Sequence, residues 1–381
     1  MMDWTDRHCR YFHRLLTRHT LLYTEMVTTG ALRHGDVQRH LRFNAEEHPL
    51  ALQLGGSEAD ELAYAARLGE QWGYDEINLN CGCPSERVQR GAFGACLMNE
   101  PQTVADGVKA MLDVVNIPVT VKHRIGIDRL ESYDFVRDFV GQVADAGCRV
   151  FIVHARNAWL QGLSPKENRE IPPLRYESVY RLKRDFPQLT IAINGGITNN
   201  EQIAEHLGHV DGAMLGRESY YRPWLMTDWD RRFWGDARAT VPEREHIEEA
   251  MVSYMERAHA EDGCPWYAIA RHMLGLYHGQ RGGRLWRQVW SNHKLKPLPP
   301  RGMMTSTYAG MAMSCPTASR SVVGTSCTAS AGSPACCRAC CTSAAKALFE
   351  SMASEPPRKM QALPLLMARD AASMVTLGRL S

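Results

Sequence analysis

Short apolar runs recur along the first 216 residues of the chain, and each is bounded by polar residues. They predict seven β-strands, at Leu21–Glu25, Leu50–Leu54, Glu76–Asn80, Val119–Lys122, Val150–His154, Thr190–Asn194 and Gly212–Gly216. Amphipathic patterns with a helical period lie between most of these strands, at Glu58–Trp72, Thr103–Val115, Tyr133–Ala146 and Arg175–Phe186. Strands and helices that alternate in this way form parallel βαβ units. The sequence therefore predicts an α/β fold.

The number of predicted strands is one short of a closed barrel. A (β/α)8 TIM barrel has eight parallel strands, whereas the first helical pattern here, Arg7–Leu16, has no strand before it. We therefore expect a TIM barrel whose first strand is missing. Loss of that strand would leave two barrel strands as unpaired edges.

The pattern changes after Gly235, where only helices are predicted, at Glu243–Ala260, Trp266–Tyr277 and Arg284–His293. From Lys296 onward, prolines and then a mixture of Ser, Ala, Cys and Met replace any steady period, and Asp and Glu nearly vanish. We expect a barrel domain at residues 1–235, a small all-helical domain at 236–296 and an atypical, disordered tail at 297–381.

Composition is that of an ordinary globular protein, with 44% hydrophobic and 23% charged residues. No apolar stretch approaches the roughly 18 residues that a membrane span needs, and the first residues do not resemble a signal peptide. The sequence therefore predicts a cytoplasmic protein without a membrane partner, and nothing in it indicates a protein partner. The net charge is +2, but residues 1–300 contain 36 Lys and Arg against 39 Asp and Glu, so a case for nucleic-acid binding needs a local patch.

Such a patch is found in the predicted helical domain. No Asp or Glu occurs between Gly263 and Pro300, where six basic residues alternate with five aromatic ones. These are Arg271, Arg281, Arg284, Arg287, Lys294 and Lys296, and Trp266, Tyr267, Tyr277, Trp286 and Trp290. Basic residues attract phosphates, and aromatic rings serve either as a core or as surfaces on which bases stack. Both interpretations remain open, and Lys166 and Arg169 could extend the patch to the barrel rim.

Each predicted strand ends in or just before residues able to do chemistry. The set comprises Glu25, Gln53, Asn78, Asn80, Cys83, Lys122, His154, Arg156, Asn194 and Arg217. In a barrel, the carboxyl ends of all strands meet at the face that carries the active site. Gly195-Gly196 and Gly216-Arg217 follow the last two strands, where barrel enzymes hold phosphate through backbone N–H groups and a charged donor.

Three strand-end residues suit a flat heteroaromatic cofactor. Gln53 both donates and accepts hydrogen bonds at a ring edge, Lys122 places a positive charge beside a ring that becomes anionic on reduction, and His154 donates to the ring or its phosphate. An alternative for Lys122 is the Schiff-base lysine of an aldolase.

Cys83 lies between Gly82 and Pro84 in a turn after the third strand, where a thiol can act as nucleophile or proton donor. A metal is not expected, because Cys81-x-Cys83 lacks further ligands nearby and structural zinc needs four. The Cys336–Cys341 cluster lies in the atypical tail without a neighbouring His.

Several of these segments resemble the tRNA-dihydrouridine synthase family, most closely the subfamily that acts on uridines 20 and 20a of the D-loop. The resemblance runs from Met1 to about Ser291 and is carried by Asp3–His8, Tyr23–Met26, Ala51–Gly56, Tyr74–Asn80, Gly82–Ser85, Phe93–Met98, Val119–Lys122, His154–Arg156, Ser164–Leu174, Asn194–Ile197 and Leu215–Arg217. The stretch Asn168–Leu174 is highly specific to the subfamily.

The resemblance implies a flavin-binding barrel and a helical domain that holds tRNA. NADPH would reduce FMN, the reduced flavin would give hydride to C6 of a uracil, and Cys83 would donate the proton to C5. Residues that match the family's flavin contacts are Gln53, Lys122, His154, Asn194, Gly195, Gly196, Gly216 and Arg217. Residues that match positions orienting the tRNA are Asn80, Lys166, Arg169, Arg284 and Arg287.

The chain departs from the family at its first strand, which ends in Ala-Pro-Met and touches the flavin. Only Met1, Met2 and Asp3 stand at that place here, so we assign them to the cofactor site. Two other functions remain open: a flavin oxidoreductase of small molecules resembling dihydroorotate dehydrogenases, and a non-catalytic tRNA-binding protein whose barrel does not hold FMN.

Overall fold

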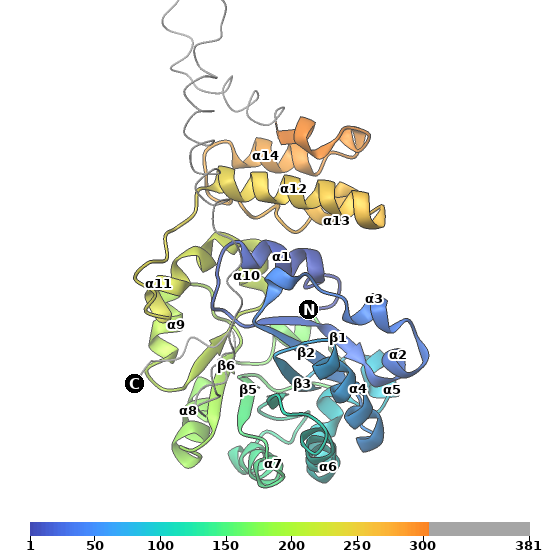
Figure 1. Cartoon of the computed structure of the whole chain (residues 1–381). Helices are drawn as coiled ribbons and strands as arrows, with labels where there is room; N and C mark the ends of the chain where they lie inside the picture. Colours follow the sequence, from blue (N-terminus) through green and yellow to red (C-terminus); the bar gives the residue numbers. More distant parts are fainter. Residues whose placement is uncertain (305–381) are drawn as a thin grey trace, which may run out of the picture. The chain divides into compact units, whose positions relative to one another are not determined.

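Seven parallel strands form one sheet in the computed structural model, which describes residues 1–304 (Figure 1). They are β1 (Leu22–Thr28), β2 (Leu50–Gly55), β3 (Glu76–Cys81), β4 (Val119–Arg124), β5 (Val150–His154), β6 (Thr190–Asn194) and β7 (Gly212–Met214). The sheet order is the chain order. All seven predicted strands are confirmed, and β5 and β6 have the predicted bounds.

The sheet is curled and open. Neighbouring strands pair from β1 to β7, and within residues 1–304 no pairing joins β7 back to β1. The predicted α/β class is therefore confirmed as a seven-stranded, barrel-like sheet with two edges.

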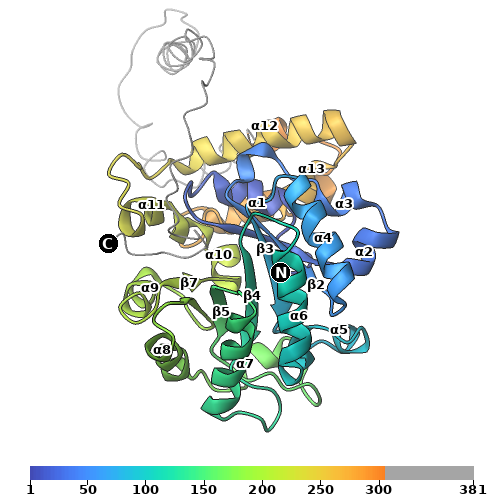
Figure 2. The ribbon, with the colours of Figure 1, turned by 60° about the horizontal axis from the view of Figure 1, so that its bottom comes forward.

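Helices return the chain along the outer face of the sheet (Figures 1 and 2). They are α4 (Ala59–Gln71), α6 (Pro101–Leu112), α7 (Tyr133–Asp145), α8 (Tyr176–Asp185) and α9 (Asn200–His206). A short helix, α5 (Glu86–Arg90), follows Ser85. The sequence did not predict α9, nor the short helices α2 (Thr29–His34), α3 (Val37–Leu41), α10 (Arg217–Tyr221) and α11 (Trp229–Phe233). These short helices offer too few turns for a hydrophobic period to be read.

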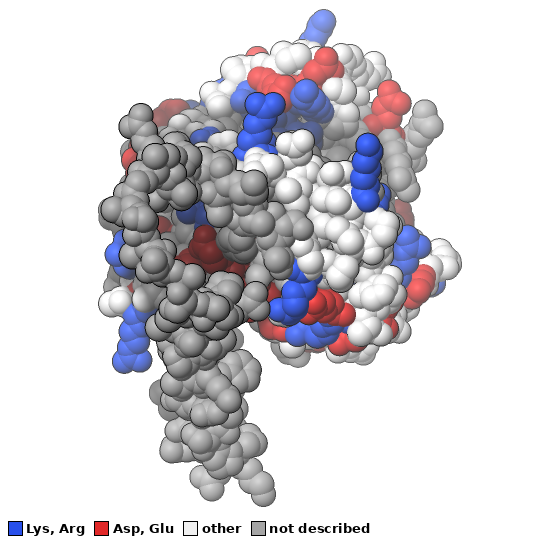
Figure 3. Space-filling view, turned by 90° about the horizontal axis from the view of Figure 1, so that it is seen from above, with Lys and Arg blue, Asp and Glu red and all other residues white. Residues whose placement is uncertain are grey.

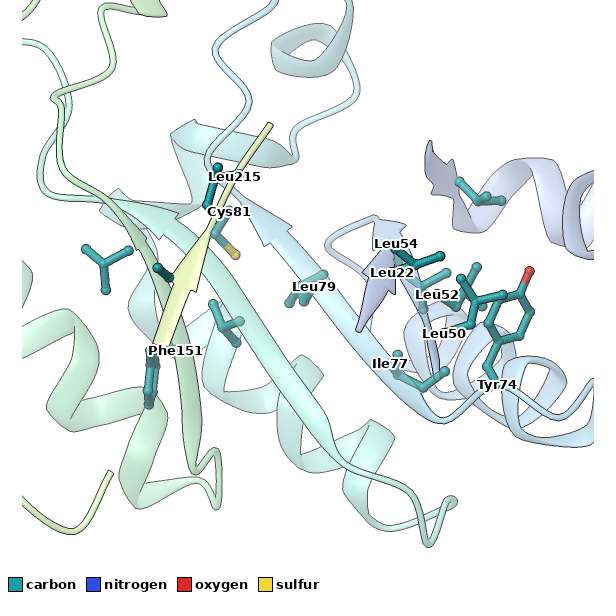
Figure 4. Packing of buried hydrophobic residues seen from close by; sticks show 14 of the residues in the cluster. Leu22, Leu50, Leu52, Leu54, Tyr74, Ile77, Leu79, Cys81, Phe151 and Leu215 are labelled. Atoms are coloured by element: carbon teal, nitrogen blue, oxygen red, sulfur yellow. The ribbon is translucent and has the colours of Figure 1, made fainter. Parts of the chain in front are cut away.

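The main core lies between the sheet and these helices. Figure 4 shows part of it, where Leu52 and Ile77 project from neighbouring strands. Helix α4 comes close to the strands at Gly69, where an added Cβ would lie 2.5 Å from Ile77 Cδ1 and 2.8 Å from Leu52 Cδ2. A strand covered on both faces, such as β5, reads as a nearly continuous apolar run.

The inner face of the sheet has its own composition. A small apolar cluster forms there from Leu21, Ala51, Val150, Ile152, Ala192 and Met214. Polar side chains lie on the same face along the later part of several strands, among them Gln53 and Asn78. Side chains alternate along a strand, and the polar ones approach the carboxyl ends, where the candidate site was predicted.

The helices after the sheet form a packed unit with an aromatic core. They are α12 (Arg244–Asp262), α13 (Trp266–Ala270) and α14 (Gly283–Trp290). The Trp266 and Trp290 rings lie 5.7 Å apart, and the Tyr277 and Trp286 rings 4.9 Å apart. The predicted helix at Trp266–Tyr277 ends early because residues 271–278 continue as turns with i to i−3 hydrogen bonds.

Helix α1 (Arg7–Arg14) links this helical unit to the sheet-bearing part of the chain. Tyr11 stacks on Tyr254 of α12, with ring centroids 3.9 Å apart, and His8 Nδ1 lies 2.7 Å from the Tyr254 hydroxyl. Asp6 caps α1 through the backbone N–H groups of His8 and Cys9 and also accepts from Arg271. The domain boundaries at 235 and 296 remain predictions.

Packing continues a little past residue 297. Met303 is fully buried, and Arg301 forms an ion pair of 2.8 Å with Glu256. None of the helices in the described part of the chain is both long and apolar enough to cross a membrane. Of the tail predicted to be disordered, 297–381, the first eight residues therefore include packed ones, and residues 305–381, with the Cys336–Cys341 cluster, lie outside the described residues.

Candidate functional site

Strand register brings most of the predicted site residues to one rim of the sheet. Asn80 pairs with Lys122 across β3 and β4, and His154 pairs with Asn194 across β5 and β6. Gln53 is bonded to Asn80 by an amide–amide hydrogen bond of 2.9 Å. These five side chains lie at the carboxyl ends of neighbouring parallel strands, as the sequence predicted.

Cys83 is held in a tight turn directly above β3. The Asn80 side-chain oxygen accepts hydrogen bonds of 3.0 Å from the backbone N–H groups of both Gly82 and Cys83. The Cys83 thiol is half-buried, and its Sγ lies 3.7 Å from the Ser85 hydroxyl. Cys81 instead is fully buried in the core, where burial raises the pKa of its thiol. Of the two cysteines, only Cys83 is at the rim.

Arg124 joins the Cys83 turn to a neighbouring loop, a role that the sequence analysis missed. Its Nε donates to the Gly82 carbonyl oxygen at 3.2 Å, and its Nη1 donates to the carbonyl oxygens of Asn157 and Asn168 at 3.1 and 3.0 Å. The signal available in the sequence was its position two residues after Lys122, on the same face of β4. Arg124 is 3% exposed, so these bonds replace its water.

The loop that Arg124 reaches carries two of the predicted tRNA contacts. Asn168 is fully buried, and its side-chain amide donates to the carbonyls of Trp159 and Leu163. Lys166 and Arg169 lie on either side of it and are exposed. The buried amide therefore fixes the loop while its neighbours stay accessible.

The rim is electropositive. Burial, together with the charge of the nearby Arg124, lowers the pKa of the Lys122 ammonium to about 8. Burial also lowers the pKa of His154 well below its ordinary range, with further lowering by Arg124, Lys122 and other cations. At neutral pH the imidazole is thus neutral while Lys122 keeps its charge, a combination that favours an anionic or electron-rich ligand.

The two glycines after β6 are required by close packing. Gly195 has φ +114°, and a Cβ there would lie 2.5 Å from Cδ2 of His154. Gly196 has φ +74°, and its Cβ would lie 2.5 Å from Leu174. The Asn194 side chain donates to the Met214 carbonyl at 2.8 Å and so ties β6 to β7. A side chain at position 195 would therefore collide with His154, and one at position 196 with Leu174, so both positions need glycine.

Gly216 and Arg217 follow β7 at the same rim. Arg217 forms an ion pair of 2.6 Å with Glu170, a partner that the sequence did not reveal. Met1 reaches this place, since a Cβ on Gly216 would lie 3.5 Å from Met1 Sδ. Met2 and Asp3 are exposed. Of the three N-terminal residues predicted to touch the cofactor, Met1 is the one placed at the rim by a contact.

The basic segment of the helical unit is resolved into a core and a surface. Four of the five aromatic residues are buried: Trp266, Tyr277, Trp286 and Trp290. The fifth, Tyr267, is 39% exposed, and Lys296 Nζ lies 4.1 Å from the centroid of its ring. For these four aromatic residues the core interpretation is correct. On the face that Figure 3 shows, Lys and Arg side chains are separated by uncharged surface and lie beside Asp and Glu.

Arg284 and Arg287 lie one turn apart on α14, and both are exposed. Neither takes part in an ion pair within residues 1–304. They therefore present two positive charges on one side of the helix.

Within residues 1–304, no group of three or more His, Cys, Asp or Glu side chains could hold a metal ion.

Comparison with known proteins agrees with the resemblance. The sequence model described as dihydrouridine synthase (Dus) matches residues 1–297. The protein named tRNA-dihydrouridine(20/20a) synthase from Vibrio parahaemolyticus is 58% identical over 298 residues, which cover 78% of this chain and 90% of that protein. The protein of the same name from Synechocystis is 58% identical over 295 residues, which cover 77% of this chain and 88% of that protein. The one from Pseudomonas aeruginosa is 59% identical over 291 residues, which cover 76% of this chain and 87% of that protein.

A solved structure of an old yellow enzyme homologue from Zymomonas mobilis has 13% identity and a TM-score of 0.44, over 64% of this chain and 89% of that one. That likeness is too slight to bear on the assignment. The sequence match, by contrast, spans the whole sheet, the rim and the helical unit at more than half identity. On this extent of similarity, the chain belongs to the dihydrouridine synthase family.

Proposed function

We propose that this chain reduces uridine to 5,6-dihydrouridine in tRNA. The observation that carries the proposal is the Cys83 thiol, held on a polar, electropositive rim by Asn80 and Arg124. The relatives' name, tRNA-dihydrouridine(20/20a) synthase, supports positions 20 and 20a of the D-loop as the target.

The rim residues fit a flavin mononucleotide by the chemistry of their donors. Gln53 and Asn80 offer amide edges, Lys122 offers a charged donor, and His154 is a neutral imidazole beside two glycines. Arg217, Asn194, Gly216 and Met1 complete the set that would surround the ring and its phosphate. We propose FMN as cofactor and NADPH as its reductant; bound FMN, once reduced by NADPH, would supply a hydride for C6 of the uracil.

The protein's own part in the chemistry is to deliver a proton. Adding hydride at C6 turns the C5=C6 double bond into an enolate-like anion with charge at C5 and O4, which an acid must quench. Cys83 would donate its thiol proton to C5, and solvent would restore the thiol afterwards. The half-buried position of the thiol, above β3 and beside Ser85, suits a donor that a base can approach.

The target base must leave its stack to reach this rim, so the protein must also hold the tRNA. We propose that Lys166 and Arg169 contact the backbone near the flipped uridine, that Asn80 orients its base, and that Arg284 and Arg287 bind phosphates farther away. The segment 236–296 would then be the tRNA-binding domain. An enzyme of this kind would act in the cytoplasm.

The test is a visible spectrum of the purified full-length chain, followed by anaerobic NADPH and then tRNA lacking dihydrouridine. Flavin bands that bleach with NADPH and recover with tRNA would support the proposal. Bleaching that only small-molecule acceptors such as quinones or orotate reverse would favour a small-molecule flavin reductase. A colourless chain that binds tRNA after added FMN would favour a non-catalytic tRNA-binding protein.

A further inference from the structure

Strand β3 carries three polar side chains in a row on the inner face of the sheet: Glu76, Asn78 and Asn80. Glu76 is 2% exposed and Asn78 is fully buried. The strand register places Gln53 of β2 on one side of Asn78 and Thr120 of β4 on its other side. A polar layer therefore crosses three strands next to the inner apolar cluster, where each polar group needs a partner.

These side chains form one continuous hydrogen-bond chain. From the rim inward, the Gly82 and Cys83 N–H groups donate to Asn80 at 3.0 Å, and the Asn80 amide donates to Gln53 at 2.9 Å. Below that layer, the Gln53 amide donates to Asn78 at 2.9 Å, and Asn78 donates to Thr120 at 2.8 Å. The Thr120 hydroxyl donates to Glu76 Oε1 at 2.7 Å.

All the bonds of this hydrogen-bond chain donate in the same direction, from the rim toward Glu76, and both ends fix that direction. At the rim, the backbone N–H groups can only donate, so Asn80 must turn its oxygen toward them and its nitrogen toward Gln53. At the other end, Glu76 Oε1 accepts from Thr120 and also from the Tyr23 hydroxyl at 2.9 Å. Because the Thr120 hydroxyl uses its single hydrogen in the bond to Glu76, its oxygen can only accept a hydrogen bond from Asn78. Every amide between the two ends is thereby held in one of its two orientations.

We propose that Glu76 is a positioning residue: through Thr120 and Asn78 it holds the Gln53 amide in the one orientation that also matches Asn80, which the Gly82 and Cys83 N–H groups orient from the rim. The inference rests on the proposed function, because it assigns Gln53 to the flavin edge and Asn80 to the base. Gln53 uses one N–H and one lone pair in these bonds, so its second N–H and second lone pair remain for a ligand. The Asn80 oxygen accepts from both backbone N–H groups, so Asn80 keeps its second N–H for a ligand. A ligand with a fixed pattern of donors and acceptors then meets a rim that is already oriented.

The protein offers a matched pair of variants. Thr120→Val and Tyr23→Phe each delete one hydroxyl that donates to the same Glu76 oxygen. Only Thr120→Val interrupts the chain, because Tyr23 is a side branch. A role limited to stability would make the two variants equivalent, whereas a positioning role separates them.

Two measurements on the full-length chain read out the position of the rim amides. The first is hydrogen exchange of the Gly82–Cys83 peptide without added ligand, and the second is the FMN dissociation constant with the shape of the bound flavin's absorption bands. We expect Thr120→Val to speed exchange and to weaken FMN binding about tenfold, with altered bands. Tyr23→Phe should leave both measurements near those of the parent, although its melting temperature falls by a similar amount.

Equal effects of the two variants in both measurements would overturn the inference. If Thr120→Val does not fold, Glu76→Gln and Glu76→Met replace the pair, since the amide keeps an acceptor for Thr120 and the thioether does not. Glu76→Gln should then behave as the parent and Glu76→Met as the broken chain, and equivalence of these two would equally overturn it. A parent that binds no FMN would defeat the proposed function, while the exchange comparison would still decide the positioning role.

Discussion

At the scale of single residues, function depends on which side of a strand end a side chain faces. Cys81 and Cys83 are two residues apart, yet one thiol is sealed in the core and the other is half-buried at the rim. The turn that separates their environments is set by Asn80, whose oxygen accepts two consecutive backbone N–H groups. Position, and not residue type, therefore makes Cys83 and not Cys81 the proposed proton donor.

Replacing Cys83 with Ala should leave flavin and tRNA binding intact and slow uridine reduction about 10²- to 10⁴-fold, the usual contribution of a positioned general acid. Single-turnover reduction of tRNA, followed by the recovery of flavin absorbance, measures this step directly. Cys96→Ala is the matched control, because that half-buried thiol lies nearby but donates to the Phe93 carbonyl. Unchanged turnover in Cys83→Ala would show that the proton comes from elsewhere.

The buried Glu76 should leave a signature in stability against pH. Burial raises the pKa of its carboxyl to about 7, against the lowering effect of its bonds to Thr120 and Tyr23. The folded state therefore holds a proton that the unfolded state releases near its ordinary pKa of roughly 4.3. The free energy of unfolding should fall as pH rises from about 4.5 to 7, by up to about 3 kcal/mol relative to Glu76→Gln. Chemical denaturation of both proteins at several pH values checks this, and parallel curves would contradict it.

At the scale of elements, the strands and long helices were readable from the sequence, and the connections between them were not. A strand such as β5 is buried on both faces, so its apolar run Val150–His154 coincides with the element. Arg124 could not be assigned its partners, because Gly82, Asn157 and Asn168 are brought to it only by folding. Nor could the sequence show that Thr120, an ordinary strand residue, links Asn78 to Glu76.

The Arg124 contacts predict that two loops loosen together. Arg124→Met should speed hydrogen exchange in both the Cys83 turn and the loop around Asn168, because buried carbonyls lose a charged donor, at a cost of about 1–3 kcal/mol. Exchange measured by mass spectrometry on both peptides tests this coupling. Arg175→Met is the control, since it removes a partly exposed ion pair with Glu131 that is worth about 1 kcal/mol or less. Loosening of only one of the two loops in Arg124→Met would argue against the link.

At the scale of the whole molecule, the proposed function would have the rim and the helical unit act on one tRNA. The buried aromatic residues of that unit explain how a short segment without acidic residues remains folded: its rings form the core, so its basic residues are left for the surface. The sequence suggested a basic, aromatic segment but could not separate these roles, because a tryptophan that packs and one that stacks look the same in the sequence. Burial of Trp286 between Tyr277 and Trp290 separates them.

Arg284 and Arg287 should therefore contribute affinity for tRNA through charge alone. Changing both to Ala should weaken tRNA binding and reduce the slope of log affinity against log salt by roughly one to two, as expected when about two phosphate contacts are lost. NADPH oxidation by the flavin should be unaffected, since the two residues lie on α14 and not at the rim. The matched control changes Lys109 and Arg137, exposed cations paired with acids on the outer helices α6 and α7. If this control lowers the salt slope equally, the effect belongs to net charge; if the α14 pair slows NADPH oxidation as well, the two arginines support the fold and not the tRNA.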